Sequence, residues 1–190
     1  MAHQLQTSLL FDEADAEIRG PDVTYVESFT EHHQEWFDAL IENLHWNSQY
    51  KSRLTHTFGV SYNYKKGTKK VREMPHFLEP VCERIEKKFG YLPNNCLANY
   101  YPSGEHYISL HSDQDDEMKA QTGVTIVSLG SVRTMELRNI SNPKLRFFYP
   151  LQPGSAFYME DELQKEWKHG IPREAEAGPR ISLSFRALIA

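Results

Sequence analysis

The repeat of hydrophobic positions changes near Gly90. Before it, two segments, 28–46 and 75–90, place apolar residues at helical spacing. Ser28 and Glu31 fit a capping box at the start of the first segment, and Gly90 is a typical stop for the second. We therefore expect two helices in the first half of the chain.

After Gly90 the apolar residues alternate with polar ones in short runs, a pattern typical of strands. Turn-forming residues at 102–104 and 152–154 separate several of these runs. The runs are CLANYY, HYISLHSD, GVTIVSLG, RTMELRN, LRFFYPL, SAFYME and RISLSFRALI. Strands that follow two helices predict an α+β protein with a mostly β core, either a helix-supported β-sandwich or a jelly roll.

Length and composition fit one soluble domain, 1–190. No apolar run reaches the ~18 residues that span a bilayer, and the N-terminus lacks a signal pattern. Cys82 and Cys96 are too few for a disulfide scaffold, and we interpret them as reduced, buried thiols. We expect an intracellular monomer without a membrane partner.

Charge is unevenly distributed along the chain. Lys51–Arg72 contains seven Lys or Arg residues and no acid, so a chain of formal charge -5 divides into about +7 there and about -12 elsewhere. A lysine-rich loop in water has this composition. Aromatic residues are interleaved with the cations, however, and that combination suits nucleic acid, in which bases stack beside phosphates.

The run HYISLHSD carries a candidate metal site. On a strand, His111 and Asp113 point to the same side and supply two thirds of a two-histidine, one-carboxylate site for Fe(II). The alternative is a polar strand end that leads into a solvated acidic loop. His169, which precedes Gly170, is the best candidate for a third ligand.

The last run separates polar and apolar positions completely. Arg180, Ser182, Ser184 and Arg186 alternate with three apolar residues. The polar face of such a strand could lie in water. Two arginines and two hydroxyls on one face could equally hold a dicarboxylate, because guanidinium groups pair with carboxylates through two parallel hydrogen bonds.

The order NYY, HSD, KHG and RISLSFR resembles the AlkB-like Fe(II)/2-oxoglutarate dioxygenases, which demethylate nucleic-acid bases oxidatively. The resemblance covers about residues 53–188 and implies a double-stranded β-helix with helices on one side. It implies iron on His111, Asp113 and His169. It implies 2-oxoglutarate on Asn99, Tyr101, Arg180, Ser184 and Arg186.

The resemblance also divides the chain. It implies an N-terminal extension and helix (1–50), a basic, aromatic substrate-recognition lid (51–74), a supporting helix (75–90) and the catalytic core (91–190). In the lid, Tyr62 and Tyr64 would stack on the target base, although Tyr62 could instead pack in the core. Asp115 would accept a hydrogen bond from the exocyclic amine of the base, unless it is merely solvated. Lys65, Lys66, Lys69 and Lys70 would contact the nucleic-acid backbone.

The implied reaction consumes O2 and 2-oxoglutarate and releases succinate, CO2 and formaldehyde. Its substrates would be bases of the N1-methyladenine or N3-methylcytosine type in DNA or RNA. An alternative is a hydroxylase with the same cofactors that acts on a protein side chain or a small molecule, because one fold supports both. A third hypothesis is a non-catalytic binding module, and the complete set of candidate ligands counts against it.

Overall fold

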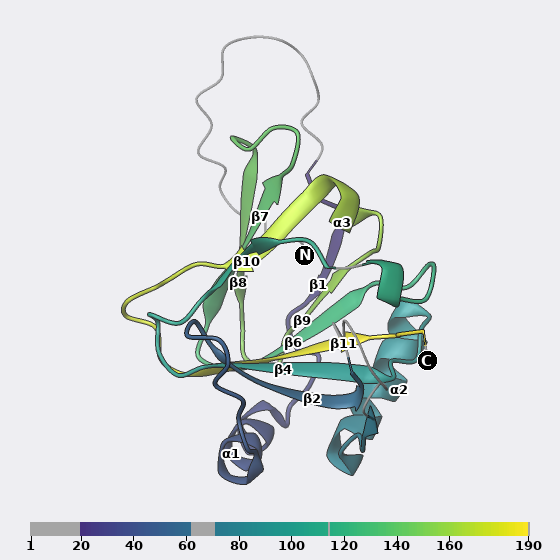
Figure 1. The fold of residues 1–190 in the computed structure, drawn as a ribbon, viewed down its shortest axis with the longest axis vertical. Coiled ribbons are helices and arrows are strands. Elements are labelled where there is room, and N and C mark those ends of the chain that lie inside the picture. The colour runs from purple at the N-terminus through teal and green to yellow at the C-terminus, as the bar shows by residue number, and fades with distance from the viewer. Residues whose placement is uncertain (1–19, 62–70, 114, 190) are drawn as a thin grey trace.

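The computed structural model describes residues 20–61, 71–113 and 115–189, which form two antiparallel sheets (Figure 1). The large sheet has the order β1-β9-β6-β11-β4-β2-β3, and the small sheet has the order β5-β10-β7-β8. The large sheet comprises β1 (Val23–Val26), β2 (Leu54–Val60), β3 (Val71–Arg72), β4 (Asn95–Tyr101), β6 (Val124–Gly130), β9 (Ala156–Met159) and β11 (Arg180–Arg186). The small sheet comprises β5 (Ile108–His111), β7 (Arg133–Asn139), β8 (Arg146–Leu151) and β10 (Trp167–Ile171).

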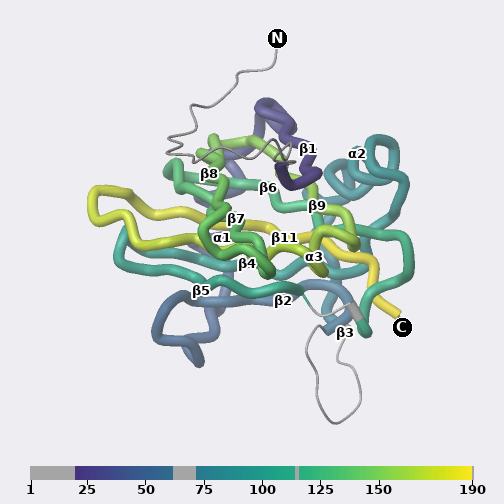
Figure 2. The backbone as a smooth tube through the Cα atoms, turned by 90° about the horizontal axis from the view of Figure 1, so that it is seen from above, coloured from purple at the N-terminus to yellow at the C-terminus, as the bar shows by residue number. Residues whose placement is uncertain are grey.

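Two helices support the large sheet on the side away from the small sheet (Figure 1). They are α1 (His33–Asn43) and α2 (Glu79–Phe89), and a short 3-10 helix, η1 (His76–Leu78), leads into α2. A third helix, α3 (Leu163–Glu166), precedes β10. The predicted α+β fold with a mostly β core is confirmed, and seen from above the strands lie across one another in two layers (Figure 2).

The two predicted helix ends have different outcomes. Gly90 ends α2 with a φ of +77°, as expected of a glycine stop. The capping box is wrong, because α1 begins after His32 and no side chain caps it. The backbone N–H groups of Phe29 and Thr30 instead donate to the Gly154 carbonyl at 2.8 and 3.0 Å. A tertiary contact therefore holds the segment that the local pattern assigned to the helix.

The hydrophobic core lies in two clusters on the two sides of the large sheet. Strand β11 is central in this sheet, and its Ile181, Leu183 and Phe185 are fully buried against the helix side. Burial of side chains of this size contributes about 1.5–3 kcal/mol each. Because side chains alternate along a strand, its polar residues face the space between the sheets. They are at most 5% exposed, which excludes a polar face in water.

The segment 51–74, predicted as a lid, contains part of the large sheet. Strand β2 pairs with β4 over Leu54–Gly59, and β3 pairs with the end of β2. Strand β1 also joins this sheet by pairing with β9. The sheet therefore draws on strands that precede the predicted core of 91–190. Residues 62–70, which include four candidate lysines and both candidate tyrosines, lie outside the described residues.

The described residues also bear on the membrane and cysteine predictions. Among them, no helix combines the length and the apolar character needed to cross a bilayer. Cys82 and Cys96 are buried and free, as predicted. Burial raises the pKa of the Cys82 thiol to about 11, so it is protonated and unreactive at neutral pH.

Candidate active site

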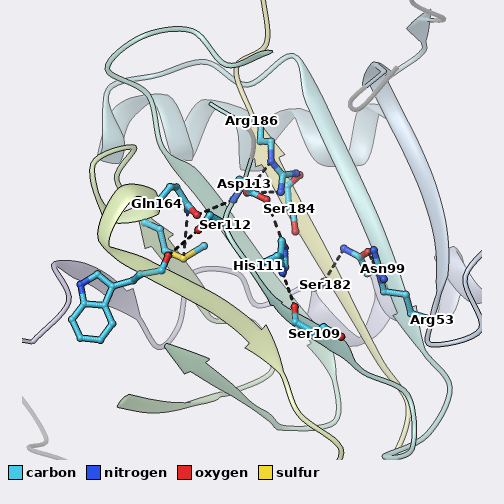
Figure 3. A network of polar contacts seen from close by, with 12 residues as sticks. Arg53, Asn99, Ser109, His111, Ser112, Asp113, Gln164, Ser182, Ser184 and Arg186 are labelled. Carbon is cyan, nitrogen blue, oxygen red and sulfur yellow. Dashed lines mark hydrogen bonds and ion pairs between the residues drawn. The ribbon is translucent and has the colours of Figure 1, made fainter. Parts of the chain in front are cut away.

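The two sheets enclose a cavity of about 380 Å³. All eight residues predicted to hold iron or 2-oxoglutarate line this cavity (Figure 3 shows five of them). They are Asn99, Tyr101, His111, Asp113, His169, Arg180, Ser184 and Arg186. Apolar side chains of both sheets, Leu97, Ile126, Met135 and Ile171, complete part of the wall. The fold thus brings the separate sequence motifs to one place.

Three potential metal ligands meet at one end of the cavity. His111 ends β5 and lies directly opposite His169 of β10, while Asp113 follows β5 by two residues. One ligand atom from each of the three lies within 4.8 Å of the others. The two imidazole rings have their centroids 4.3 Å apart. Strand pairing therefore presents both histidines to the carboxylate from adjacent strands.

The hydrogen bonds of the histidines leave nitrogen lone pairs for a metal. His111 Nδ1 lies 2.8 Å from the Ser109 carbonyl oxygen, which can only accept, so Nδ1 carries the proton and Nε2 is free to ligate. That Nε2 is 3.8 Å from Asp113 Oδ1. His169 Nδ1 is buried without a hydrogen-bond partner in the described part of the chain. Burial lowers the pKa of His169 to about 3, so its ring is neutral at physiological pH.

Asp113 is buried and paired with Arg186. Its Oδ2 accepts hydrogen bonds from Arg186 Nη2 at 2.7 Å and Nε at 3.2 Å. Burial, the largest single effect, would raise the pKa of the Asp113 carboxyl, but Arg186, His169 and His111 together outweigh it and hold the pKa below its ordinary value. The ionised carboxylate keeps Oδ1 turned toward His111. Two imidazoles and one carboxylate form a donor set that fits Fe(II).

Arg180, in the wall of the same cavity, offers an anion site. The side chain is fully buried, and its Nη2 donates to Ser128 Oγ at 2.9 Å. Its Nε and Nη1 have no partner among the described residues. Burial lowers the pKa of Arg180 to about 10, which still leaves it charged at neutral pH. A buried cation with two unused donors fits a carboxylate such as that of 2-oxoglutarate.

Asn99 is held by Arg53, which the sequence analysis did not place in the site, and by Ser182, which it placed on the polar face of the last strand. Its Oδ1 accepts a hydrogen bond from Arg53 Nε at 2.9 Å, and its Nδ2 donates to Ser182 Oγ at 3.4 Å (Figure 3). Ser182 shares a strand face with Arg180, as the alternation of polar and apolar residues in the sequence indicated. Arg53 lies 46 residues before Asn99, and no sequence spacing indicates their contact.

Gln164 and Ser112 form hydrogen bonds between the segment that carries Asp113 and the segment that leads to His169. The buried Gln164 accepts a hydrogen bond from the Asp113 backbone N–H at 3.0 Å through its Oε1 (Figure 3). The Ser112 hydroxyl donates to the Trp167 carbonyl oxygen at 3.2 Å. Both contacts join the segment after β5 to the segment that enters β10. Sequence reasoning did not identify Gln164, whose partner is 51 residues away.

The predicted substrate residues fall mostly outside the described part. Asp115, two residues after the candidate ligand Asp113, begins a 3-10 helix, η2 (Asp115–Glu117), but its side chain is not described. Tyr62 and Tyr64 lie outside the described residues. The same holds for Lys65, Lys66, Lys69 and Lys70. Their roles stay predictions.

Curated proteins with sequences similar to this chain include dioxygenases and demethylases. The chain is 30% identical over 149 residues to the alpha-ketoglutarate-dependent dioxygenase alkB homolog 3 of Homo sapiens, which covers 72% of this chain and 51% of that protein. It is 26% identical over 153 residues to the human DNA oxidative demethylase ALKBH2, covering 76% and 59%. The chain thus spans little more than half the length of these curated relatives.

Solved structures and the family match agree with the fold. The structure of OsALKBH1 superposes with a TM-score of 0.66 at 15% identity, over 90% of this chain and 100% of that chain. A 2OG-Fe(II) oxygenase family protein from Burkholderia pseudomallei gives a TM-score of 0.61 at 12% identity, over 86% and 84%. Residues 4–186 match the family model of the 2OG-Fe(II) oxygenase superfamily. The chain therefore belongs to the 2OG-Fe(II) oxygenase superfamily and resembles its AlkB-type dioxygenases.

Proposed function

We propose that this chain oxidatively demethylates alkylated bases in DNA or RNA, with Fe(II), 2-oxoglutarate and O2. The observation that carries the proposal is the single cavity whose wall holds both a two-histidine, one-carboxylate ligand set and a buried arginine with two unused donors. Family membership supports the cofactors. The printed names of the relatives, a dioxygenase and a DNA oxidative demethylase, support the class of substrate.

His111, Asp113 and His169 would hold the iron. Three protein ligands leave coordination positions for 2-oxoglutarate and O2. Bound together, iron and 2-oxoglutarate supply the oxidising chemistry that hydroxylates an N-alkyl carbon. The protein's part is to keep the His169 imidazole unprotonated, to fix Asp113 through Arg186, and to limit water with the apolar wall.

Arg180 would bind one carboxylate of 2-oxoglutarate through its charge and one of its two unused donors, Nε or Nη1. Asn99 is oriented for this co-substrate because Arg53 occupies its Oδ1, which fixes which end of the amide carries the N–H donors. Tyr101 and Ser184 line the same cavity and would complete the pocket. Arg186 would contribute mainly through Asp113, since that carboxylate already takes two of its donors.

The substrate would enter as a single extruded base. Loss of Watson–Crick pairing lowers the cost of extrusion, which is a few kcal/mol for an ordinary base. N1-methyladenine and N3-methylcytosine lack this pairing and carry positive charge. Asp115, whose backbone follows Asp113 by two residues, would favour that charge. Tyr62, Tyr64 and the four lysines of 65–70 would contact the base and the phosphates.

The proposal is tested with a panel of methylated oligonucleotides. The protein is loaded anaerobically with Fe(II) and 2-oxoglutarate, exposed to air and analysed by mass spectrometry. We expect the mass of the oligonucleotide to fall by one methylene per repaired base, with equal amounts of formaldehyde and succinate. Succinate that forms equally with and without every oligonucleotide, with no change in oligonucleotide mass, would favour a hydroxylase of protein or small molecules instead.

Gln164 gives a prediction about metal binding. We expect Gln164→Leu to weaken Fe(II) or Co(II) binding by about 10- to 100-fold, the usual effect of removing a group that positions a ligand. The substitution removes the acceptor for the Asp113 backbone N–H. Calorimetric titration of the metal measures the effect without any turnover. Gln34→Leu, on the exposed side of α1, is the matched control. Equal affinities in all three proteins would show that Gln164 has only a packing role.

A further inference from the structure

Two arginine–tyrosine pairs lie at the rim of the cavity. The Arg53 guanidinium carbon is 4.6 Å from the centre of the Tyr50 ring, and that of Arg173 is 4.1 Å from the centre of the Tyr107 ring. Arg53 and Tyr107 also line the cavity itself. These four residues are called the rim pairs below.

The rim pairs are built into one edge of the site. The Tyr107 backbone N–H donates to the Ser52 carbonyl oxygen at 2.9 Å, which brings the segment before β2 against the segment before β5. Arg53 extends from there into the cavity, where it donates to Asn99. The Arg53–Tyr50 pair is therefore positioned by the contact of Arg53 with the co-substrate pocket. The Arg173–Tyr107 pair is positioned by β5, the strand that follows Tyr107 and carries His111.

The rim pairs remain available to a ligand. Tyr50 is 47% exposed, and the Arg173 side chain is 58% exposed. Exposed cation–π pairs contribute only about 0.5–1 kcal/mol to a fold, so folding alone gives a weak reason for two of them at one edge. Lys51, also exposed, adds a third cation to this edge, while the Glu105 carboxylate lies 3.8 Å from Arg173 and the Glu174 carboxylate lies 3.7 Å from the buried Arg133.

We infer that the rim pairs form a stacking platform for the nucleotides next to the target base in a single-stranded nucleic acid. An aromatic ring with a guanidinium on it offers two flat surfaces for unpaired bases, and the guanidinium also attracts the adjacent phosphate. A base that enters the cavity carries its neighbours past Arg53 and Tyr107, because both belong to the wall and to the rim. The bases of a duplex stay stacked on one another, so a duplex would interact with the rim pairs mainly through its phosphates and the positive charge of the arginines.

The inference rests on the proposed function, and its test separates the two. Affinity is measured by fluorescence anisotropy with a single-stranded oligonucleotide that contains N1-methyladenine, and with the same strand in a duplex. Tyr50→Leu and Tyr107→Leu should each raise the single-strand Kd by about five- to 100-fold, the effect of losing one stacked base. Tyr107→Phe keeps the ring and should bind like the unchanged protein.

The control is an equivalent pair elsewhere on the surface. Arg146 lies over the exposed Phe148 at 5.8 Å on β8, at the edge of the small sheet opposite β5. Phe148→Leu should leave both Kd values unchanged. Tyr50→Leu should also leave calorimetric binding of 2-oxoglutarate unchanged.

Each remaining outcome decides one question. Demethylation with an unchanged single-strand Kd in Tyr50→Leu and Tyr107→Leu would overturn the platform and leave the proposed function intact. Equal losses on single strand and duplex would overturn the single-strand assignment. A protein that neither binds nor demethylates any methylated oligonucleotide would overturn the proposed function, and the platform with it.

Discussion

Asp113→Ala is expected to weaken Fe(II) binding by more than about 100-fold and to stop metal-dependent consumption of 2-oxoglutarate. Substitutions behind a metal ligand cost about 10- to 100-fold in affinity, so loss of the anionic ligand itself should cost more. Asp113 supplies the negative charge in the cluster that the described residues form. Calorimetric titration with Fe(II) under anaerobic conditions, followed by a succinate assay in air, measures both effects.

The same substitution is also expected to lower the free energy of unfolding. Arg186 is 4% exposed and would lose the carboxylate that accepts two of its hydrogen bonds. Removing one partner of a buried ion pair costs about 3–5 kcal/mol. Asp113→Asn keeps an oxygen for Arg186 and should retain more of this stability in urea denaturation, while it still lacks the charged ligand.

A nearby acid is the control for both measurements. Asp116 is exposed in η2, and Asp116→Ala should change neither Fe(II) affinity nor stability. Unchanged Fe(II) affinity in Asp113→Ala would remove this carboxylate from the metal site. Unchanged stability would mean that Arg186 finds another acceptor once the carboxylate is gone.

Arg180→Met is expected to raise the Kd for 2-oxoglutarate by about 100-fold or more. Hydrogen bonds to charged groups are worth about 1.5–3 kcal/mol each, and Arg180 has two unused donors for the co-substrate. Methionine fills a similar volume without a charge, so the buried site should tolerate it. The measurement is 2-oxoglutarate binding by calorimetry to metal-loaded protein, without nucleic acid.

Two further variants test whether Arg180 acts through its charge and its planar donors. Arg180→Lys keeps the charge but loses the planar pair of donors, so it should bind 2-oxoglutarate more weakly than the unchanged protein and more tightly than Arg180→Met. Arg138→Met, on β7 of the small sheet, should have no effect. If Arg180→Met folds and binds 2-oxoglutarate normally, the carboxylate site lies elsewhere in the cavity.

Local alternation predicted the strands of the core well. RTMELRN matches β7 at both ends, and the polar and apolar faces of RISLSFR match the two sides of β11. The alternation of polar and apolar residues is clear there because a buried strand must keep the same residues on the same face along its whole length. The two short strands β1 and β10 gave no comparable pattern. Pairing with a neighbour defines each of these two strands more than its own sequence does.

Contacts between distant segments escaped the sequence analysis. Arg53 was counted among the cations of the predicted lid, yet it donates to Asn99 in the co-substrate pocket. Gln164 belongs to a four-residue helix without a recognisable motif, yet it holds the backbone of Asp113. In both cases the chemistry of the side chain is ordinary. Only the fold determines which partner it reaches, and therefore what it does.

The placement of β11 limits how this chain can vary. The strand is buried on both faces, with the apolar residues toward the helices and the polar residues toward the cavity. Inserting or deleting one residue inside it would invert the facing of the residues on one side of the change, so either Arg180 would enter the apolar core or Phe185 would enter the cavity. Fold and site would fail together. Evolutionary change in substrate preference is therefore most easily accommodated outside this strand, in the rim segments and loops.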